Sequence, residues 1–201
     1  MTSPVKTPSP SATANPETHS PNAEFPPAPA VLLPEDEVQG RVTALAELIA
    51  HYIKPDCVCI CLLTGGIWFA SDLTRALDRA GRPTFFDALW LSSYGDGHES
   101  GAMLIRAPLQ RSVEGRQVLI IDDVLDTGAS LKIAREIVIE AGAAEVLTAV
   151  FARKPDPLKD GARREIEADF TAWEAPNRYL VGYGLDDGGL YRSLPYIGAM
   201  D

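Results

Sequence analysis

The stretch Val118-Leu-Ile-Ile-Asp-Asp-Val-Leu-Asp-Thr-Gly-Ala-Ser-Leu131 places an apolar run, three acidic residues and a glycine-containing turn in direct succession. Residues 118–121 are all apolar and rich in β-branched side chains, which is typical of a strand covered on both faces in a parallel sheet. Residues 131–141 carry apolar side chains at helical spacing, so the turn of residues 127–130 should open a helix. The stretch predicts a strand, a polar loop and a helix in succession.

The polar loop has the chemistry of an anion site. Backbone N–H groups at a helix start have no partner inside the helix, and with the positive end of the helix dipole they attract a phosphate, to which Thr127 and Ser130 add hydroxyl donors. Asp122 and Asp123 follow the strand at the sheet edge where open α/β proteins bind ligands. Their carboxylates can accept hydrogen bonds from sugar hydroxyls or bind a divalent cation. A phosphorylated sugar satisfies both halves of the loop.

Two common classes of phosphate-binding loop require glycines and a lysine that this loop lacks. The Gly-Lys-Ser or Gly-Lys-Thr ending of nucleotide hydrolases and the spaced glycines of dinucleotide-binding proteins are both missing, which excludes those two classes. Acidic residues before a helix can also serve as ordinary caps that compensate the helix dipole. Further motifs are therefore needed to distinguish a ligand site from a cap.

The stretch resembles the phosphoribosyl pyrophosphate signature of the purine phosphoribosyltransferases, in which an apolar strand leads to two acidic residues, two apolar residues and Asp-Thr-Gly. Several more ordered motifs extend the resemblance to the hypoxanthine-guanine phosphoribosyltransferases, and together they cover nearly all of residues 35–201. These motifs are Leu63-Thr-Gly-Gly-Ile-Trp-Phe-Ala-Ser-Asp-Leu73, Ser92-Ser-Tyr94, Ala152-Arg-Lys-Pro155, Tyr179-Leu-Val-Gly-Tyr-Gly-Leu-Asp186 and Tyr191-Arg-Ser-Leu194.

The order of predicted elements agrees with an α/β fold. Helical patterns begin near residue 34, after residue 66 and at residue 131, and strand patterns cover residues 58–63, 84–92, 103–106, 118–121 and 145–154. This alternation predicts a doubly wound, mainly parallel sheet with flanking helices. Three aromatic-rich segments follow with no helix between them, and we expect them to form a small C-terminal hood lobe rather than to extend the sheet. They are residues 169–173, 179–183 and 191–197.

The two ends of this domain, and a glycine-rich loop within it, differ from the core. Residues 1–30 are dominated by Pro, Ser, Thr, Ala and Asn and are expected to be a disordered tail. The domain should then span residues 31–201, with its core at about 34–155 and its hood at about 165–201. Residues 94–108 begin with a polar, glycine-rich sequence and are expected to form a mobile flap.

Composition restricts the location and the partners. The net charge of −10 argues against a nucleic-acid surface, which requires clustered Lys and Arg. We expect a cytoplasmic protein with no membrane contact, because no signal pattern or long apolar run is present. Cys57, Cys59 and Cys61 alternate along a predicted strand, and three free buried thiols suit a reducing compartment better than a zinc site.

The resemblance implies transfer of the phosphoribosyl group from phosphoribosyl pyrophosphate to a 6-oxopurine (hypoxanthine, guanine or xanthine), with Mg²⁺ as cofactor and assembly as a homodimer or homotetramer. It assigns phosphoribosyl pyrophosphate binding to Thr64, Gly65, Gly66, Ser93, Tyr94, Asp122, Asp123, Asp126, Thr127, Gly128, Ala129 and Ser130. It assigns purine binding to Lys154, Tyr179, Leu180 and Asp186, and metal binding to Asp122, Asp123 and Asp186. The implied catalytic residues are Asp126, Lys154 and Arg192.

These assignments agree with the chemistry of the side chains. Asp126 can handle the proton of the purine imidazole ring, and Lys154 is a donor that fits a 6-oxo group and rejects a 6-amino group. Thr64 departs from the family, which often has a basic residue there; relatives can also contain a non-proline cis peptide bond in this loop. Two alternatives remain: a regulator that senses phosphoribosyl pyrophosphate with the same fold, and an enzyme of the same fold that uses another acceptor.

Overall fold

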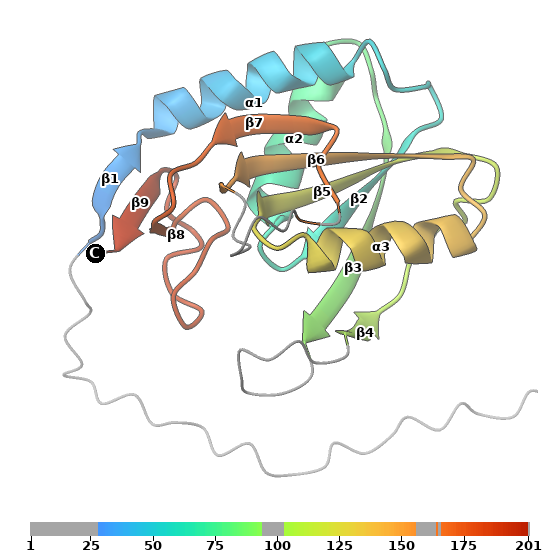
Figure 1. Cartoon of the computed structure of the whole chain (residues 1–201). Helices are drawn as coiled ribbons and strands as arrows, with labels where there is room; N and C mark the ends of the chain where they lie inside the picture. Colours follow the sequence, from blue (N-terminus) through green and yellow to red (C-terminus); the bar gives the residue numbers. More distant parts are fainter. Residues whose placement is uncertain (1–27, 94–102, 156–163, 165, 201) are drawn as a thin grey trace, which may run out of the picture.

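The computed structural model describes residues 28–93, 103–155, 164 and 166–200. A six-stranded sheet in the order β4-β3-β2-β5-β6-β7 forms the centre of this part of the chain (Figure 1). All neighbouring strands are parallel except β4, which is antiparallel to β3. The strands are β2 Val58–Leu63, β3 Phe85–Ser93, β4 Met103–Ala107, β5 Gln117–Leu125, β6 Glu145–Arg153 and β7 Phe170–Glu174.

Helices cover both faces of this sheet. On one face α1 (Glu35–Ile49) and α2 (Ile67–Arg79) pack over the cysteines of β2, and on the other face α3 (Ala129–Glu140) packs over the residues between those cysteines (Figure 1). Successive strand residues point to opposite faces, so a central strand with two covered faces has no polar position. This arrangement confirms the predicted doubly wound, mainly parallel fold.

A second, smaller sheet joins the two ends of the domain. It has the order β1-β9-β8, with antiparallel pairs between β1 (Ala30–Leu33), β9 (Ile197–Met200) and β8 (Tyr179–Val181). The N-terminal strand therefore forms part of the hood, an arrangement that the local sequence did not indicate. The predicted tail overlaps this strand at Ala30, and residues 1–27 lie outside the described part of the chain.

One expectation for the C-terminal part was wrong. Phe170–Glu174 extends the central sheet as β7, parallel to β6, and Asp169 fixes this edge because its carboxylate accepts hydrogen bonds from the amide and hydroxyl of Thr148. The expectation failed because parallel neighbours are usually connected through a helix, and no helical pattern separates these strands. The last predicted segment does belong to the hood: residues 191–196 form turns and bends, and β9 begins at Ile197.

The predicted flap is described in part. Residues 103–107 form β4, and residues 94–102 lie outside the described residues, as does Tyr94 with them. None of the described helices is both long enough and apolar enough to span a membrane.

Candidate active site

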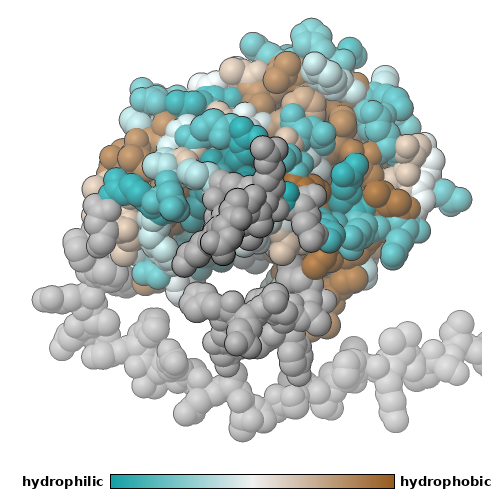
Figure 2. All heavy atoms as spheres, in the orientation of Figure 1, coloured by the Kyte–Doolittle hydropathy of each residue, from teal (hydrophilic) through white to brown (hydrophobic). Residues whose placement is uncertain are grey.

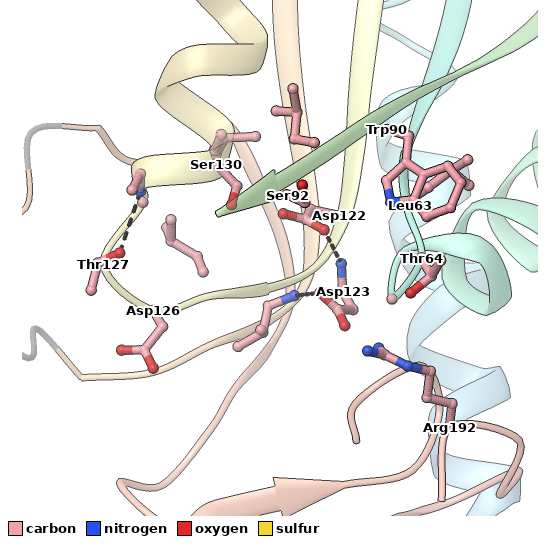
Figure 3. A pocket seen from close by; sticks show the side chains of 17 residues that line it. Leu63, Thr64, Trp90, Ser92, Asp122, Asp123, Asp126, Thr127, Ser130 and Arg192 are labelled. Atoms are coloured by element: carbon pink, nitrogen blue, oxygen red, sulfur yellow. Dashed lines mark hydrogen bonds between the residues drawn. The ribbon is translucent and has the colours of Figure 1, made fainter. Parts of the chain in front are cut away.

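One cavity of about 440 Å³ lies at the carboxyl ends of the central strands (Figure 3). The ends of β2, β3 and β5 and the start of α3 form its walls, and Arg192 reaches it from the hood. The carboxyl ends of parallel strands share one sheet edge, and ligands bind there in open α/β folds. The lining residues are Leu63, Thr64, Gly65, Trp90, Leu91, Ser92, Asp122 through Leu131 and Arg192.

The loop between β5 and α3 forms one wall of the cavity. Gly128 has φ of 83°, a left-handed conformation that favours glycine, and a Cβ atom at this position would lie 2.7 Å from Cγ2 of Ile166. The helix starts at Ala129; its N-cap residue Gly128 has no side chain, and the Ala129 amide makes only a long hydrogen bond of 3.4 Å to Oγ1 of Thr127. The first amides of α3 can therefore bind an anion in the cavity, where Thr127 and Ser130 also lie (Figure 3).

Two adjacent carboxylates follow the buried part of β5. Asp122 points toward Ser92 and Asp123 points toward Arg192 (Figure 3). Each accepts a hydrogen bond from the next backbone amide, at 3.0 Å for Asp122 and 2.8 Å for Asp123. Burial and the neighbouring charge of Asp123 raise the pKa of Asp122 well above its usual range. Burial also raises the pKa of Asp123, although its hydrogen bonds and Arg192 oppose this shift. Two buried carboxylates this close repel each other when both are ionised. Hydrogen bonds from sugar hydroxyls or a bound cation would stabilise the ionised pair.

The loop after β2 lies beside this pair. Its Leu63–Thr64 peptide bond is cis, and a Cβ atom on Gly65 would overlap the carboxylate of Asp123. A Cβ atom on Gly66 would lie 2.7 Å from the carbonyl oxygen of Leu62, so neither glycine has room for a side chain. Thr64 is exposed and lines the cavity. The loop can therefore present main-chain groups to a ligand at very close range.

The predicted purine residues lie beside the cavity rather than in its wall. The Lys154 Nζ atom is 3.4 Å from Oδ2 of Asp126, and the Lys154 amide donates to the carbonyl of Leu125 at 3.1 Å. The ring of Tyr179 is half exposed, and its hydroxyl donates to Asp187 at 3.2 Å. Leu180 is buried, and its side chain packs in the core.

Hood residues Asp186 and Arg192 form an ion pair at 2.6 Å. Arg192 also donates to the carbonyl of Gly184 at 2.6 Å, and Asp186 accepts from the amide of Gly189 at 2.7 Å. Gly184 has φ of 105° and packs directly on the carbonyl of Gly65. The hood therefore docks on the loop after β2 and brings Arg192 to the cavity.

The structure brings most of the predicted phosphoribosyl pyrophosphate residues into one cavity. The exception among the described side chains is Gly66, which is buried at the start of α2; Tyr94 lies outside the described residues, so its predicted role is not tested, and neither is that of the Ser93 side chain. Trp90 also lines the cavity, and it was not among the residues predicted from the sequence. The sequence could have indicated Trp90, because it lies two residues before Ser92 and alternate residues of a strand share a face.

A metal ion in this cavity would need ligands beyond those that the described residues supply. Within the described ranges, no three His, Cys, Asp or Glu side chains lie close enough together to hold one. Asp186 is paired with Arg192 rather than grouped with Asp122 and Asp123. The two adjacent carboxylates offer hard oxygen donors, which suit a cation that keeps waters and takes further oxygens from a phosphorylated substrate.

Comparisons with known proteins agree with this geometry. Residues 36–176 match the family model described as the phosphoribosyl transferase domain. The chain is 37% identical to hypoxanthine-guanine phosphoribosyltransferase of Bacillus subtilis (strain 168) over 85% of this chain and 92% of that protein. It is 36% identical to the enzyme of that name from Aquifex aeolicus (strain VF5) over 83% and 92% of the two chains.

Solved structures extend the likeness to three dimensions. Trypanosoma cruzi hypoxanthine phosphoribosyltransferase, solved in complex with the product IMP, matches with a TM-score of 0.77 and 30% identity, covering 89% of this chain and 97% of that one. The chain belongs to the phosphoribosyltransferase family, and within it to the hypoxanthine-guanine branch.

Proposed function

We propose that this protein transfers the 5-phosphoribosyl group from phosphoribosyl pyrophosphate to a 6-oxopurine, releasing pyrophosphate and forming a nucleoside monophosphate for purine salvage. The single observation that carries the proposal is the cavity in which the open amides of α3 lie beside the paired carboxylates of β5. A phosphorylated sugar needs donors for its phosphate and acceptors for its hydroxyls, and this cavity holds both.

The sugar donor would lie along the cavity from α3 toward the hood. The amides of α3, together with Thr127 and Ser130, would hold the 5-phosphate, and Asp122 and Asp123 would accept hydrogen bonds from the ribose hydroxyls. The pyrophosphate would lie against Gly65 and Arg192. Because Thr64 carries no charge, Arg192 is the cation among the lining residues of this described cavity.

The same acids suit the Mg²⁺ that the family implies. Asp122 and Asp123 would hold the ion, and Asp186 would contribute only if its ion pair with Arg192 opened. When bound, Mg²⁺ supplies charge neutralisation for the leaving pyrophosphate. Arg192 adds a fork of hydrogen-bond donors for the same group.

Asp126 and Lys154 together can recognise the base. Their side chains lie 3.4 Å apart, so an acceptor and a donor stand side by side, as do the imidazole N–H and the 6-oxo group of a 6-oxopurine. Asp126 would take the imidazole proton as the ring nitrogen forms its bond to ribose. A 6-amino group would point its own donor at Lys154 and would be rejected. Tyr179 offers an exposed ring face for stacking on the base.

Steady-state assays with phosphoribosyl pyrophosphate, Mg²⁺ and each of hypoxanthine, guanine, xanthine and adenine test this function. We expect turnover with one or more of the 6-oxopurines and none with adenine. Tight binding of phosphoribosyl pyrophosphate with no turnover of any base would instead favour a sensor of that metabolite. Turnover of adenine or of a non-purine acceptor alone would show an enzyme of the same fold with another substrate.

We also propose that the protein assembles as a homodimer or homotetramer in the cytoplasm. Apolar side chains gather where β3 and β4 lie (Figure 2), and four of the exposed ones lie in β3, in β4 or at the start of α2. They are Ile67, Phe86, Trp90 and Leu104. Exposed patches of this kind commonly mark subunit interfaces. Light scattering coupled to size exclusion measures the assembly, and Phe86→Glu should shift it toward the monomer. The three buried free cysteines agree with a reducing compartment.

A further inference from the structure

A buried arginine outside the cavity, Arg164, contacts the strand end that carries Lys154. Its side chain is only 2% exposed. Its Nη2 atom donates a 2.7 Å hydrogen bond to the main-chain carbonyl of Lys154, and its Nη1 atom lies 3.7 Å from the carboxylate of Glu167. Moving a guanidinium out of water costs much free energy unless hydrogen bonds and opposite charges compensate it. The contacts of the buried Arg164 side chain therefore matter for its position.

Lys154 is held at its two main-chain polar groups by different parts of the fold. It follows the last residue of β6, where the regular strand pairing stops. Its amide donates to Leu125 at the end of β5, and its carbonyl accepts from Arg164. A side chain keeps a defined direction only when its own backbone is fixed. The two hydrogen bonds therefore fix the backbone from which the Lys154 side chain reaches Asp126.

The same short segment also touches the phosphate loop. Ile166 is buried in the core on the α3 side, next to Leu125 and Leu131. Its Cγ2 atom occupies the space that a side chain on Gly128 would need. Arg164 thus lies in a segment that is anchored against the loop at one residue and holds the lysine at another.

We propose that Arg164 is a positioning residue that fixes the backbone of Lys154 and thereby sets the spacing between the Lys154 ammonium group and the Asp126 carboxylate. This inference rests on the proposed role of Lys154 in recognising the 6-oxo group. Arg164 does not touch the base itself. Its loss should weaken recognition of the purine and leave the grip on phosphoribosyl pyrophosphate in place.

Arg153 offers a matched control. It is the neighbour of Lys154 in the sequence and shares Glu167 with Arg164, but its side chain is 37% exposed. It pairs with Glu174 at 2.6 Å and with Glu167 at 3.5 Å. Surface ion pairs of this kind contribute little, so Arg153→Met should behave nearly as the wild type.

The first measurement compares Michaelis constants. We expect Arg164→Met to raise KM for hypoxanthine about tenfold, the loss typical of one charge-assisted hydrogen bond, with KM for phosphoribosyl pyrophosphate changed less than about twofold. Arg164→Lys keeps a donor of the same charge and should recover part of the loss. An equal rise in both constants, or an unchanged KM for hypoxanthine in Arg164→Met, would overturn the positioning role.

The second measurement needs no turnover. Hydrogen exchange of the Lys154 amide, followed by NMR in the unliganded protein, should accelerate about tenfold in Arg164→Met and stay unchanged in Arg153→Met. The amide of Ile60 in the centre of β2 serves as the reference for global opening, since a general loss of stability would speed both amides. If the wild type converts no purine, the proposed function fails. The exchange of the Lys154 amide still shows whether Arg164 holds this backbone, and equal acceleration of both amides, or none, would refute it.

Discussion

The two halves of the proposed site, one for the phosphate and one for the purine, are built in different ways. The phosphate half is one continuous segment from Asp122 to Ser130, in which strand, loop and helix follow each other directly. The purine half collects Lys154 after β6 and Tyr179 in β8 from separate parts of the chain. Local backbone geometry fixes the first half, whereas hydrogen bonds between distant segments fix the second. The two halves should therefore respond to substitution in different ways.

The hood shows how far this dependence extends. Tyr183 has φ of 49°, is buried, and donates a 2.9 Å hydrogen bond to Asp72 in α2. Gly184 then packs on Gly65, and Arg192 follows into the cavity. One side of the hood is thus anchored on α2, the helix that follows the loop after β2. The position of Arg192 depends on contacts made far from it in the sequence.

The largest effect should come from the residue where the two halves meet. Asp126→Asn keeps the shape of the side chain but removes the acceptor for the imidazole proton. We expect kcat to fall by about 10²- to 10⁴-fold with hypoxanthine, with smaller changes in either KM, measured by steady-state kinetics. Asp78→Asn, on the exposed side of α2, is the matched control. A loss below about fivefold, close to the level of the control, would remove Asp126 from the proton-transfer role.

The next effect isolates the phosphate half. Gly128→Ala forces a side chain into a left-handed conformation and against Ile166, which should displace the amides at the start of α3. We expect KM for phosphoribosyl pyrophosphate to rise about 10- to 100-fold and KM for hypoxanthine to change little. Gly142→Ala introduces comparable strain at φ of 87° after α3, away from the cavity, and should lower stability without this kinetic effect. If both variants alter the same constant, the loop has no special part in phosphate binding.

A smaller effect isolates the purine half. Lys154→Ala removes the donor for the 6-oxo group, so KM for hypoxanthine should rise about tenfold and discrimination against adenine should weaken. KM for phosphoribosyl pyrophosphate should change much less. Arg153→Ala, one residue earlier, serves as the control. Equal losses on the two substrates would contradict the separation of the halves.

The smallest expected effect is on stability and concerns Asp122. Because its pKa is raised by burial and by Asp123, the folded protein holds a proton that the unfolded chain releases above pH of about 4. Stability should therefore fall as pH rises from that value through the folded pKa. Asp122→Asn removes this loss and should raise Tm by about 2–4 °C at pH 8, in the presence of a chelator and without substrate. Differential scanning fluorimetry should show the gain vanishing near pH 4, and a lower Tm at pH 8 would refute the origin assigned to the shift.

The sequence alone predicted the elements whose signals are local. The apolar strands of the core, the helix after Gly128 and the acids of β5 were all confirmed in their places. Each depends on periodicity or on backbone rules that act within a few residues. The failures were non-local. β7 joined the central sheet because β6 offered an unpaired edge, and β1 completed the hood although it lies at the other end of the chain.

The sequence by itself therefore determined the fold class and the succession of strand, loop and helix from β5 to α3, since burial patterns and a helix start depend on consecutive residues. Only the tertiary structure decided that Lys154 stands beside Asp126, that Asp186 pairs with Arg192, and that a buried Arg164 supports the lysine from behind. The physical reason is that hydrogen bonds and ion pairs depend on distances of a few ångströms. Between residues far apart in the chain, those distances are set by the packing of the whole fold.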